Sequence, residues 1–332
     1  TILIEPGDYP NTAVVVDKDV TLAAADPASP PRIWAPEDGP TALITFDGPV
    51  EKEGPYAILL RDSEAIVSGL RFTGLRSAVH ASGGAPTVSD SYFEGVGVPY
   101  EGGFPEFDRH AVTVNDDAQA TVIGNTFDGG GGIGVYDLPV VQVLDNVLTG
   151  GPDICCDFGE TSVVSGNTIE GAGVSGIAVF RGEGVTVDGN SISEPGQNGI
   201  KTQGRHLVTG NTVTGAAGFA VIAEGEDDGP IVRDNVLRDN QAGITWSAAS
   251  GELSANTVTD GNNGVIIVEG APMVTDNTIE DNELVGLSLG RTAQASISGN
   301  RICGSRTNIV FPDGSGSTVD DTNEICEDAT DG

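Results

Sequence analysis

Short runs in which apolar and polar residues alternate recur along most of the chain. Examples are TVIGNTF at 121–127, GIGVY at 132–136 and VQVLDNVL at 141–148. A period of two residues is typical of β-strands, and the Gly, Asn and Asp residues between the runs are typical of tight turns. The pattern therefore predicts many short strands separated by turns.

One phrase of this pattern repeats with a nearly constant period. It is marked by an Asn whose successive spacings are 21, 21, 23, 21, 24, 21, 21, 23 and 23 residues. Leu70 and Ser91 occupy the same point of the phrase further upstream. A period in the twenties indicates stacked supersecondary units that cannot bury their apolar faces alone. The repeated residues are Asn125, Asn146, Asn167, Asn190, Asn211, Asn235, Asn256, Asn277, Asn300 and Asn323.

Leucine-rich repeats and parallel β-helices share this period, and the residue types separate them. Leucine-rich repeats need a dense Leu pattern and room for a helical segment, whereas each unit here holds β-branched strands and turns. We therefore predict a parallel β-helix of roughly a dozen coils that forms one domain over residues 1–332. Asn tolerates left-handed turns and carries both a donor and an acceptor, so we expect the repeated Asn side chains to form a hydrogen-bonded ladder.

The GNTI and GI phrases resemble the right-handed parallel β-helix repeats of the pectate-lyase-like superfamily. The resemblance covers nearly the whole chain, from TILIEPGDYPNTAVVVDKDVTL to TNEIC. It implies the fold, and it implies polysaccharide lyases, mannuronan epimerases, pectin methylesterases and carbohydrate-binding or sensor ectodomains as the range of functions. One fold hosts many functions, so the site residues must decide among them.

The charge of the chain restricts its partners. The formal net charge is −34, with 49 acidic residues against 15 basic ones. Nucleic-acid binding needs Lys and Arg to displace counterions, so a nucleic-acid partner is not expected. No apolar run reaches the length of a membrane span, so we expect no membrane segment. The opening TILIEPGDY starts directly as a strand and turn, so we expect the natural chain to begin further upstream.

The four cysteines fall into two pairs. Cys303 and Cys326 each lie three residues after a ladder Asn, at equivalent points of adjacent coils. One strand spacing suits a disulfide, so we predict a Cys303–Cys326 bond that pins the last coil over residues 300–332. Such a bond indicates a secreted or extracytoplasmic protein. For the adjacent Cys155 and Cys156 we expect two free thiols rather than a vicinal disulfide.

Candidate chemistry concentrates on the outward positions of one strand per coil. We align these positions on the Gly–Ile pairs. One column then reads His80, Thr113, Gly134, Cys155, Ala178, Lys201, Ala220, Thr245 and Ile266. The next column reads Ser82, Asn115, Tyr136, Asp157, Phe180, Gln203 and Ile222. Four residues on or beside this strip are candidates for substrate binding: His80, Asn115, Arg205 and His206.

An insertion interrupts the period between Ser91 and Asn125, where the spacing rises to 34 residues. We expect a loop over residues 94–110, since long insertions in repeat proteins map to one face and are frequently on the binding face. Its aromatic side chains would stack on sugar rings. The candidate binding residues of this loop are Tyr100, Phe104, Asp108 and Arg109.

The loop also resembles a motif of mannuronan epimerases and related alginate lyases, which carry Asp-x-His with a Tyr, a Lys and an Arg nearby. Asp108 and His110 keep that spacing, although Arg109 stands where the family has Pro. The resemblance implies Lys201 as the base, with Tyr136 or His110 as its proton partner and Arg181 holding the uronate carboxylate. Removing the proton next to that carboxylate requires such a base, proton donor and cation.

Two functional classes stay open. The first is recognition or processing of a carbohydrate polymer, with lyase or epimerase chemistry on a uronate-containing glycan. Asp157 is then a candidate ligand for Ca²⁺ or for orienting a cation. The second is a non-catalytic sensor, adhesin or structural ectodomain, in which Lys201 is one solvated lysine and the histidines are ordinary surface groups.

Overall fold

A computed structural model describes residues 1–10, 14–34, 44–45, 56–97, 110–225 and 229–329. Within these residues the chain is an all-β parallel solenoid of about 13 turns and contains no helix. Accordingly, the described part has no helix that could cross a membrane. The predicted fold class is confirmed. The chain divides into two compact units, residues 1–174 and 175–332, and each is described by itself.

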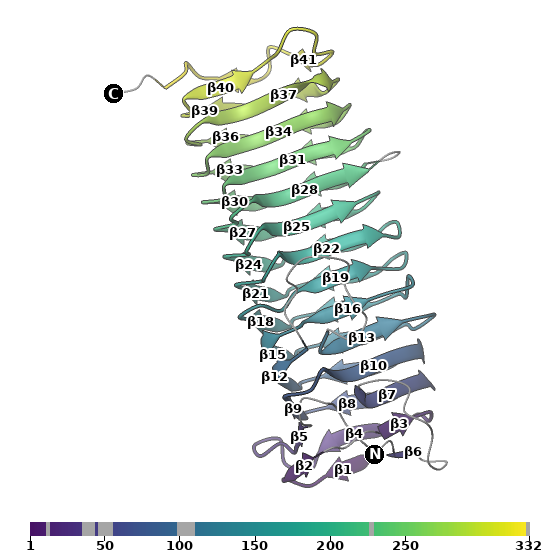
Figure 1. Ribbon diagram of the computed structural model, residues 1–332. Helices are drawn as coiled ribbons and strands as arrows, with labels where there is room; N and C mark the ends of the chain where they lie inside the picture. The colour runs from purple at the N-terminus through teal and green to yellow at the C-terminus, as the bar shows by residue number, and fades with distance from the viewer. Residues whose placement is uncertain (11–13, 35–43, 46–55, 98–109, 226–228, 330–332) are drawn as a thin grey trace. The chain divides into compact units, whose positions relative to one another are not determined.

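In unit 1 each turn of the solenoid contributes strands to three parallel sheets, which we name A, B and C (Figure 1). Sheet A contains, in order, β1 (Ile2–Ile4), β4 (Thr21–Ala24), β8 (Ile66–Ser68), β11 (Thr87–Ser89), β14 (Thr121–Ile123), β17 (Gln142–Leu144) and β20 (Val163–Ser165). Sheet B contains β2 (Asp8–Pro10), β5 (Arg32–Trp34), β9 (Arg71–Thr73), β12 (Tyr92–Val96), β15 (Thr126–Gly130), β18 (Val147–Thr149) and β21 (Thr168–Glu170). Sheet C contains β6 (Ile44–Thr45), β3 (Val14–Val16), β7 (Tyr56–Ser63), β10 (Ser77–Gly84), β13 (Val112–Asn115), β16 (Ile133–Val135) and β19 (Ile154–Asp157).

Unit 2 repeats the same three-sheet arrangement (Figure 1). Sheet A contains β23 (Thr186–Asp188), β26 (Leu207–Thr209), β29 (Ile231–Arg233), β32 (Glu252–Ser254), β35 (Met273–Thr275), β38 (Ser296–Ser298) and β41 (Thr318–Val319). Sheet B contains β24 (Ser191–Ser193), β27 (Thr212–Thr214), β30 (Val236–Arg238), β33 (Thr257–Thr259), β36 (Thr278–Glu280), β39 (Arg301–Cys303) and β42 (Glu324–Ile325). Sheet C contains β22 (Ser175–Arg181), β25 (Asn198–Gln203), β28 (Phe219–Gly225), β31 (Ala242–Ala248), β34 (Asn263–Gly270), β37 (Val285–Ala293) and β40 (Thr307–Val310).

The corner between sheets A and B depends on one left-handed residue. It is the residue before the ladder Asn in the turns from Asn125 to Asn300, such as Gly124 with φ 65°, Asp145 with φ 53° and Asp234 with φ 56°. Gly reaches this region without steric cost, and Asp tolerates it better than most residues. The sequence reasoning assigned this conformation to the Asn itself. The structure moves it one residue earlier, which leaves the Asn side chain free to point into the solenoid.

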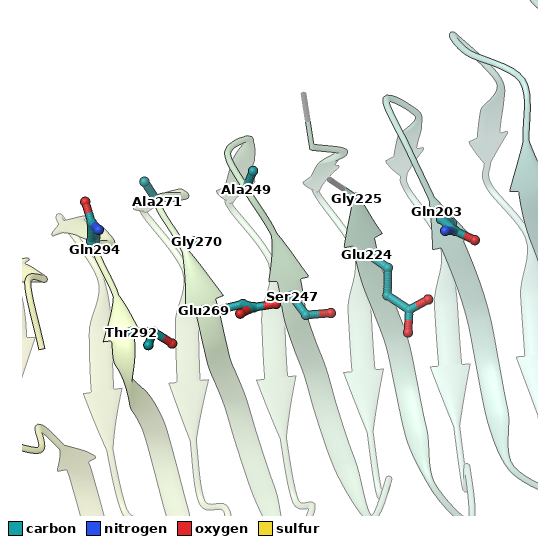
Figure 2. Close-up of a pocket in the computed structure, with 10 residues that line it drawn as sticks. All are labelled: Gln203, Glu224, Gly225, Ser247, Ala249, Glu269, Gly270, Ala271, Thr292 and Gln294. Atoms are coloured by element: carbon teal, nitrogen blue, oxygen red, sulfur yellow. The ribbon is translucent and has the colours of Figure 1, made fainter. Parts of the chain in front are cut away.

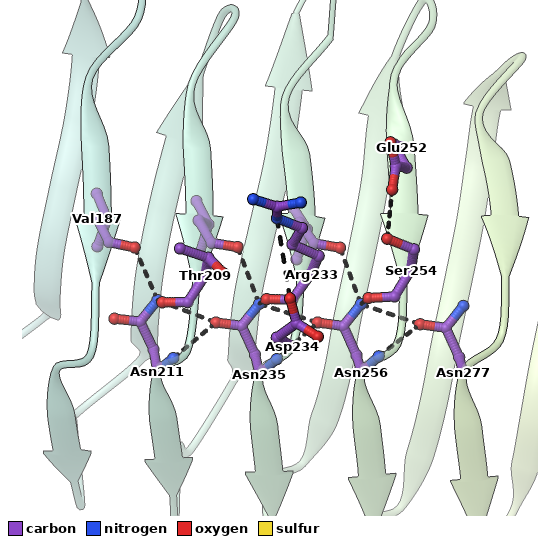
Figure 3. A network of polar contacts seen from close by, with 12 residues as sticks. Val187, Thr209, Asn211, Arg233, Asp234, Asn235, Glu252, Ser254, Asn256 and Asn277 are labelled. Carbon is purple, nitrogen blue, oxygen red and sulfur yellow. Dashed lines mark hydrogen bonds and ion pairs between the residues drawn. The ribbon is translucent and has the colours of Figure 1, made fainter. Parts of the chain in front are cut away.

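The Asn side chains form the expected ladder. In unit 1 the Asn125 side-chain amide donates to Asn146 Oδ1 at 3.0 Å, and the Asn125 backbone N–H donates to the same oxygen at 3.0 Å. In unit 2 the same pair of bonds repeats from Asn190 to Asn323, and Figure 3 shows the section from Asn211 to Asn277. The ladder thus satisfies buried polar groups that the corner removes from the sheets.

Upstream of Asn125 the ladder ends with shorter side chains. The Ser91 backbone N–H donates to Asn125 Oδ1 at 3.0 Å, and the Leu70 backbone N–H donates to Ser91 Oγ at 3.2 Å. The predicted equivalence of Leu70 and Ser91 with the ladder Asn is therefore confirmed. Below Ser91 the column passes to the apolar Leu70, which is 1% exposed.

The inward positions of the strands form thin, repeated layers. In unit 1 the rings of Phe72, Phe93 and Phe127 stack along sheet B, with centroids 5.0 Å and 4.6 Å apart. In unit 2 the column through β24, β27 and β30 is aliphatic, beginning with Ile192, Val213 and Leu237, all buried. Identical or similar side chains contact one another turn after turn because the parallel strands are in register.

A disulfide joins Cys303 to Cys326 in unit 2, with Cα atoms 4.9 Å apart. β39 and β42 pair so that Ile302 lies opposite Ile325, which places the two cysteines opposite each other. The bond links the last turn to the one before it, as the sequence predicts.

Candidate functional site

The outer face of sheet C in unit 1 carries the first candidate cluster. His80, Thr113, Gly134 and Cys155 lie opposite one another in successive strands, as the first predicted column requires. His80 and Cys155 are 6% and 5% exposed, so this face is covered along these turns. The histidines were also open to interpretation as ordinary surface groups, but His80, His110 and His206 are all buried.

His110 is the centre of this cluster. Its Nδ1 lies 2.9 Å from the Tyr136 hydroxyl, and its Nε2 lies 3.6 Å from Asp153 Oδ1 and 3.8 Å from Cys155 Sγ. The imidazole reaches residues two turns further on because Gly134 lies between them without a side chain. A Cβ atom at Gly134 would stand 2.4 Å from His110 Nδ1. Two candidate residues, His110 and Tyr136, are therefore brought together by a glycine.

His80 occupies a separate apolar environment on the same face. Its ring packs on Tyr56 with centroids 4.2 Å apart. Burial lowers the pKa of His80 from its ordinary value of 6.5, and the Asn115 side chain and the Asp116 charge oppose this effect. Burial disfavours the charged imidazolium, so His80 favours the neutral form at neutral pH. The His80 imidazole is therefore suited to hydrogen bonding in its uncharged form and not to binding a substrate carboxylate as a cation.

The prediction that Cys155 and Cys156 are free thiols is wrong. Cys155 and Cys156 form a vicinal disulfide, and the described residues contain no free cysteine. Cys155 belongs to the outer face with Asp153. Free thiols are the expectation because neighbouring side chains of a regular strand point to opposite faces, but here the two sulfur atoms meet on one side and are bonded.

In unit 2 the candidate lysine is part of an ion pair. Lys201 Nζ lies 3.2 Å from Glu224 Oε2 and 5.9 Å from the centre of the Phe180 ring. Lys201 projects from β25 and Glu224 from the next strand of sheet C. Arg181 ends β22 in the same unit and is exposed. His110 and Tyr136 belong to unit 1, so the structure places the four proposed catalytic residues as two groups, one in each unit.

His206 and Arg205 lie in the turn after β25. The His206 ring is 2% exposed, and its Nε2 lies 3.0 Å from the Gln203 carbonyl oxygen. Burial lowers the pKa of His206, although the hydrogen bond to that carbonyl and the Glu183 charge oppose this effect. The residue closes the turn by a local contact. Arg205 is exposed beside it.

The end of sheet C in unit 2 is hollowed into a groove of about 610 Å³. Polar side chains from five successive strands project into it, as Figure 2 shows. Gln203 lies opposite Glu224, Glu224 lies opposite Ser247, and Glu269 lies opposite Thr292. The ten lining residues are Gln203, Glu224, Gly225, Ser247, Ala249, Glu269, Gly270, Ala271, Thr292 and Gln294. They include two carboxylates and no Lys or Arg.

The predicted columns in unit 2 need a correction. Ile222, not Ala220, lies opposite Lys201, and Glu224, not Ile222, lies opposite Gln203. The Gly–Ile alignment fails in this turn because it matches Gly218 with Gly199, whereas the register of Ile200 opposite Val221 puts Ala220 at the position of Gly199. The shift of two residues hid Glu224, which is both the partner of Lys201 and part of the groove.

The remaining candidates are the residues of the loop expected over 94–110 and Asp157. Tyr100, Phe104, Asp108 and Arg109 lie outside the described residues. Glu94 and Val96 of the expected loop instead belong to β12, since they pair with Asp128 and Gly130. Asp157 ends β19 and is half-buried.

Sequence reasoning missed Asp153, Glu224 and Glu269. Asp153 precedes a strand by one residue and shares its alternation with Cys155, which is the signal that could have found it. Glu269 lies beside a register shift between β34 and β37, where a simple repeat alignment loses its phase. Bulges of this kind re-aim side chains and are frequent next to functional sites.

Comparison with known proteins places the chain by its fold. No curated protein matches the sequence. Among solved structures, the periplasmic alginate epimerase AlgG is 16% identical with a TM-score of 0.63, over 80% of this chain and 75% of that one. The catalytic domain of a GH87 α-1,3-glucanase in complex with nigerose is 12% identical with a TM-score of 0.63, over 97% and 64%. The Dettilon tailspike protein is 12% identical with a TM-score of 0.51, over 97% and 60%.

The family model described as "Right handed beta helix region" matches residues 110–272 and 203–327. Together these ranges cover more than half of the chain, and they agree with the parallel strands and the Asn ladder. The chain therefore belongs to the right-handed β-helix family.

Proposed function

We propose that this protein binds a carbohydrate polymer along the groove of sheet C in unit 2. The observation that carries the proposal is the row of hydrogen-bonding side chains from β25 to β37, among them Gln203, Ser247 and Thr292. Neighbouring parallel strands lie about 4.8 Å apart, so these groups recur at even intervals. A polymer of repeated hydroxylated units matches such a row.

The charge of the groove favours a neutral polymer. Glu224 and Glu269 contribute carboxylates, and the groove has no Lys or Arg lining. A polyanion would meet like charge there, which disfavours it in a partly desolvated groove. Carboxylates and amides instead accept and donate hydrogen bonds to sugar hydroxyls. The GH87 α-1,3-glucanase domain with a similar fold is in complex with nigerose, a neutral disaccharide, which adds weight to this choice.

Affinity electrophoresis on a panel of neutral glucans and polyuronides tests the proposal. We expect one or more neutral glucans to slow the wild-type chain, and Gln203→Ala or Ser247→Ala to weaken the effect about 5- to 30-fold, since losing a hydrogen bond costs about 1–2 kcal/mol. Ser296→Ala, an exposed serine of sheet A, is the matched control. Equal retardation of all variants, or none by any glycan, would exclude binding in this groove.

A second candidate function is lyase or epimerase chemistry on a uronate-containing polysaccharide. The contact between His110 and Tyr136 supports it, as does the similar fold of an alginate epimerase. In this proposal Lys201 of unit 2 takes the proton next to the carboxylate and Arg181 of the same unit holds that carboxylate, while Tyr136 and His110 of unit 1 are separate candidates for the proton donor. Lys201 would first have to leave Glu224, and buried His110 would need access to the polymer.

NMR of polyuronides incubated with the protein, with and without Ca²⁺, tests this second candidate. Unsaturated chain ends would identify a lyase, and a changed uronate ratio without cleavage would identify an epimerase. Lys201→Ala should then lower the rate by at least about 100-fold, which is the typical contribution of a general base. Full activity of Lys201→Ala or His110→Ala would refute the assigned residues. Unchanged polymers would leave a non-catalytic glycan-binding ectodomain.

The two disulfides support an extracytoplasmic location for this function. Disulfides persist in oxidising compartments and are rare in the cytosol of mesophiles. The similar alginate epimerase is described as periplasmic, in agreement with this location. Fractionation of the native host with an antibody against the chain would test it, and recovery in the cytosolic fraction would contradict it.

A further inference from the structure

Three metal-binding side chains meet on the outer face of sheet C in unit 1. His110 Nε2, a carboxylate oxygen of Asp153 and Cys155 Sγ all lie within 4.8 Å of one another. None of them belongs to the groove proposed for glycan binding. His110 and Cys155 are almost fully buried, and the Asp153 side chain is 13% exposed. The cluster is thus a compact, largely buried set of N, O and S donors.

The spacing of the donors fits one metal ion. Bonds of about 2.0–2.2 Å to N and O and about 2.3 Å to S place tetrahedral ligands roughly 3.3–3.7 Å apart. His110 Nε2 lies 3.6 Å from Asp153 Oδ1 and 3.8 Å from Cys155 Sγ. Small side-chain movements bring these atoms to coordination distance. The mixed donor set suits zinc, whereas calcium and magnesium prefer oxygen ligands alone.

The surroundings of His110 also fit a ligand. The Tyr136 hydroxyl lies 2.9 Å from Nδ1, so it holds the ring with Nε2 directed at Asp153 and Cys155. Histidines that bind metals almost always have such a partner on the other ring nitrogen. Gly134 leaves the space that the ring fills.

The vicinal disulfide decides whether the third donor is available. While Cys155 is bonded to Cys156, its sulfur cannot bind as a thiolate. We propose that reduction of Cys155–Cys156 converts His110, Asp153 and Cys155 into a zinc site, with the fourth position open to water, and that oxidation dismantles it. The oxidised chain has only the His110 and Asp153 donors, so its zinc affinity is weak.

A dithiol reductant supplies the electrons and protons that this reduction needs. The S–S bond breaks, the two sulfurs take up two electrons and two protons, and the dithiol becomes a disulfide. Cys155 then releases its proton to solvent as its thiolate binds Zn²⁺, since cysteine binds zinc in the deprotonated form. Cys156, which is not one of the three donors, stays a thiol.

Two matched variants test the site without any reductant. Cys156→Ser and Cys155→Ser both remove the vicinal disulfide, and each leaves one cysteine of that pair. Only Cys156→Ser keeps Cys155, the proposed zinc ligand. Titration of the full chain with Zn²⁺ against a chromophoric chelator should give one equivalent bound to Cys156→Ser, at least about 100-fold tighter than to Cys155→Ser, because losing a ligand costs more than losing its supporting partner. Equal affinities, or no binding by Cys156→Ser, would overturn the proposal.

Wild-type protein gives an independent answer if Cys156→Ser does not fold, as judged by circular dichroism. A phosphine reductant should add one zinc equivalent that disappears in His110→Gln and in Asp153→Asn but persists in the control Asp117→Asn, which changes an exposed aspartate of unit 1. Co²⁺ should produce a thiolate charge-transfer band under the same conditions. No gain on reduction, or an equal gain in His110→Gln, would refute the site.

Reduction also frees a second set of zinc donors in unit 2, and the variants distinguish zinc bound there from zinc bound at Cys155. Cys303, Glu324 and Cys326 carry donor atoms within 4.8 Å of one another, and they become available if the second disulfide is reduced. Zinc that remains bound to reduced Cys155→Ser belongs to that group. The proposal requires one equivalent more in the reduced wild type than in reduced Cys155→Ser, and equal stoichiometry would overturn it.

Discussion

At the scale of single residues, this solenoid buries polar groups whose protonation depends on their surroundings. His80 and His206 are almost fully buried, and burial lowers the pKa of each. His110 instead contacts a tyrosine hydroxyl and a carboxylate. The sequence placed all three histidines on or near one strip but could not distinguish their roles. The partners of His80 and His110 come from other turns, whereas His206 contacts Gln203 three residues away.

The two buried histidines should make stability depend on pH. Their folded-state pKa values lie below the ordinary 6.5, so the unfolded chain binds more protons as pH falls below that value. The stabilisation is therefore complete above about pH 6.5 and is lost as pH falls toward the folded pKa, by at most about 1.4 kcal/mol per pH unit for each histidine.

Thermal melts between about pH 8 and about pH 5 check this dependence. His206→Gln keeps a polar side chain without this titration, so its melting temperature should fall less than that of the wild type on acidification. Carboxylate titration affects the wild type, His80→Gln and His206→Gln alike. If their melting temperatures fell equally with pH, the histidines would not contribute to the pH dependence.

At the scale of structural elements, the repeated turn explains what could be predicted. The ladder Asn and the left-handed residue before it recur about every 21 to 24 residues, so their pattern is local and visible in the sequence. The groove is different, because it depends on the register between turns of unequal length. A shift of two residues near Phe219 hid Glu224, and Asp153 meets His110 only because Gly134 lies between their strands.

Removing one ladder side chain should weaken the fold considerably. Asn235 is buried, its amide donates to Asn256 Oδ1 and to the Val208 carbonyl, and its carbonyl accepts from Asn211. Asn235→Ala leaves several of these groups unpaired, at a cost of about 1–3 kcal/mol for each one that water cannot reach.

Urea unfolding followed by circular dichroism provides the measurement. We expect Asn235→Ala to lose at least about 2 kcal/mol, while the exposed Asn262→Ala changes stability by less than about 0.5 kcal/mol. Similar losses for the two variants would show that the ladder does not contribute beyond an ordinary surface Asn.

At the scale of the whole molecule, charge is the dominant property. The chain carries 49 acidic and 15 basic residues, so most of the acids cannot have a cation of their own. Among the described residues, Arg71 pairs with Glu94 at 2.6 Å. Net charge far from zero keeps a protein soluble but strains the compact state by self-repulsion.

Salt should therefore stabilise this protein. Raising NaCl from about 0.01 M to about 0.15 M shortens the screening length from roughly 30 Å to about 8 Å, so repulsion between turns weakens. The melting temperature should rise by several degrees over this range. Sucrose at equal osmolarity is the control, and a flat or falling melting temperature with salt would refute the electrostatic argument.

The Cys303–Cys326 disulfide in unit 2 affects where unfolding of the solenoid can begin. Repeat arrays fray from their ends, because a terminal turn has a neighbour on one side only. Cys303–Cys326 closes a loop around that turn, so β40, β41 and β42 cannot peel away one by one while the bond is intact. Loss of the terminal turn must then wait until β39 also separates, which raises the barrier to unravelling at this end. The strands of this turn are also held in place against a second chain, which has less chance to displace one of them and add its own strand.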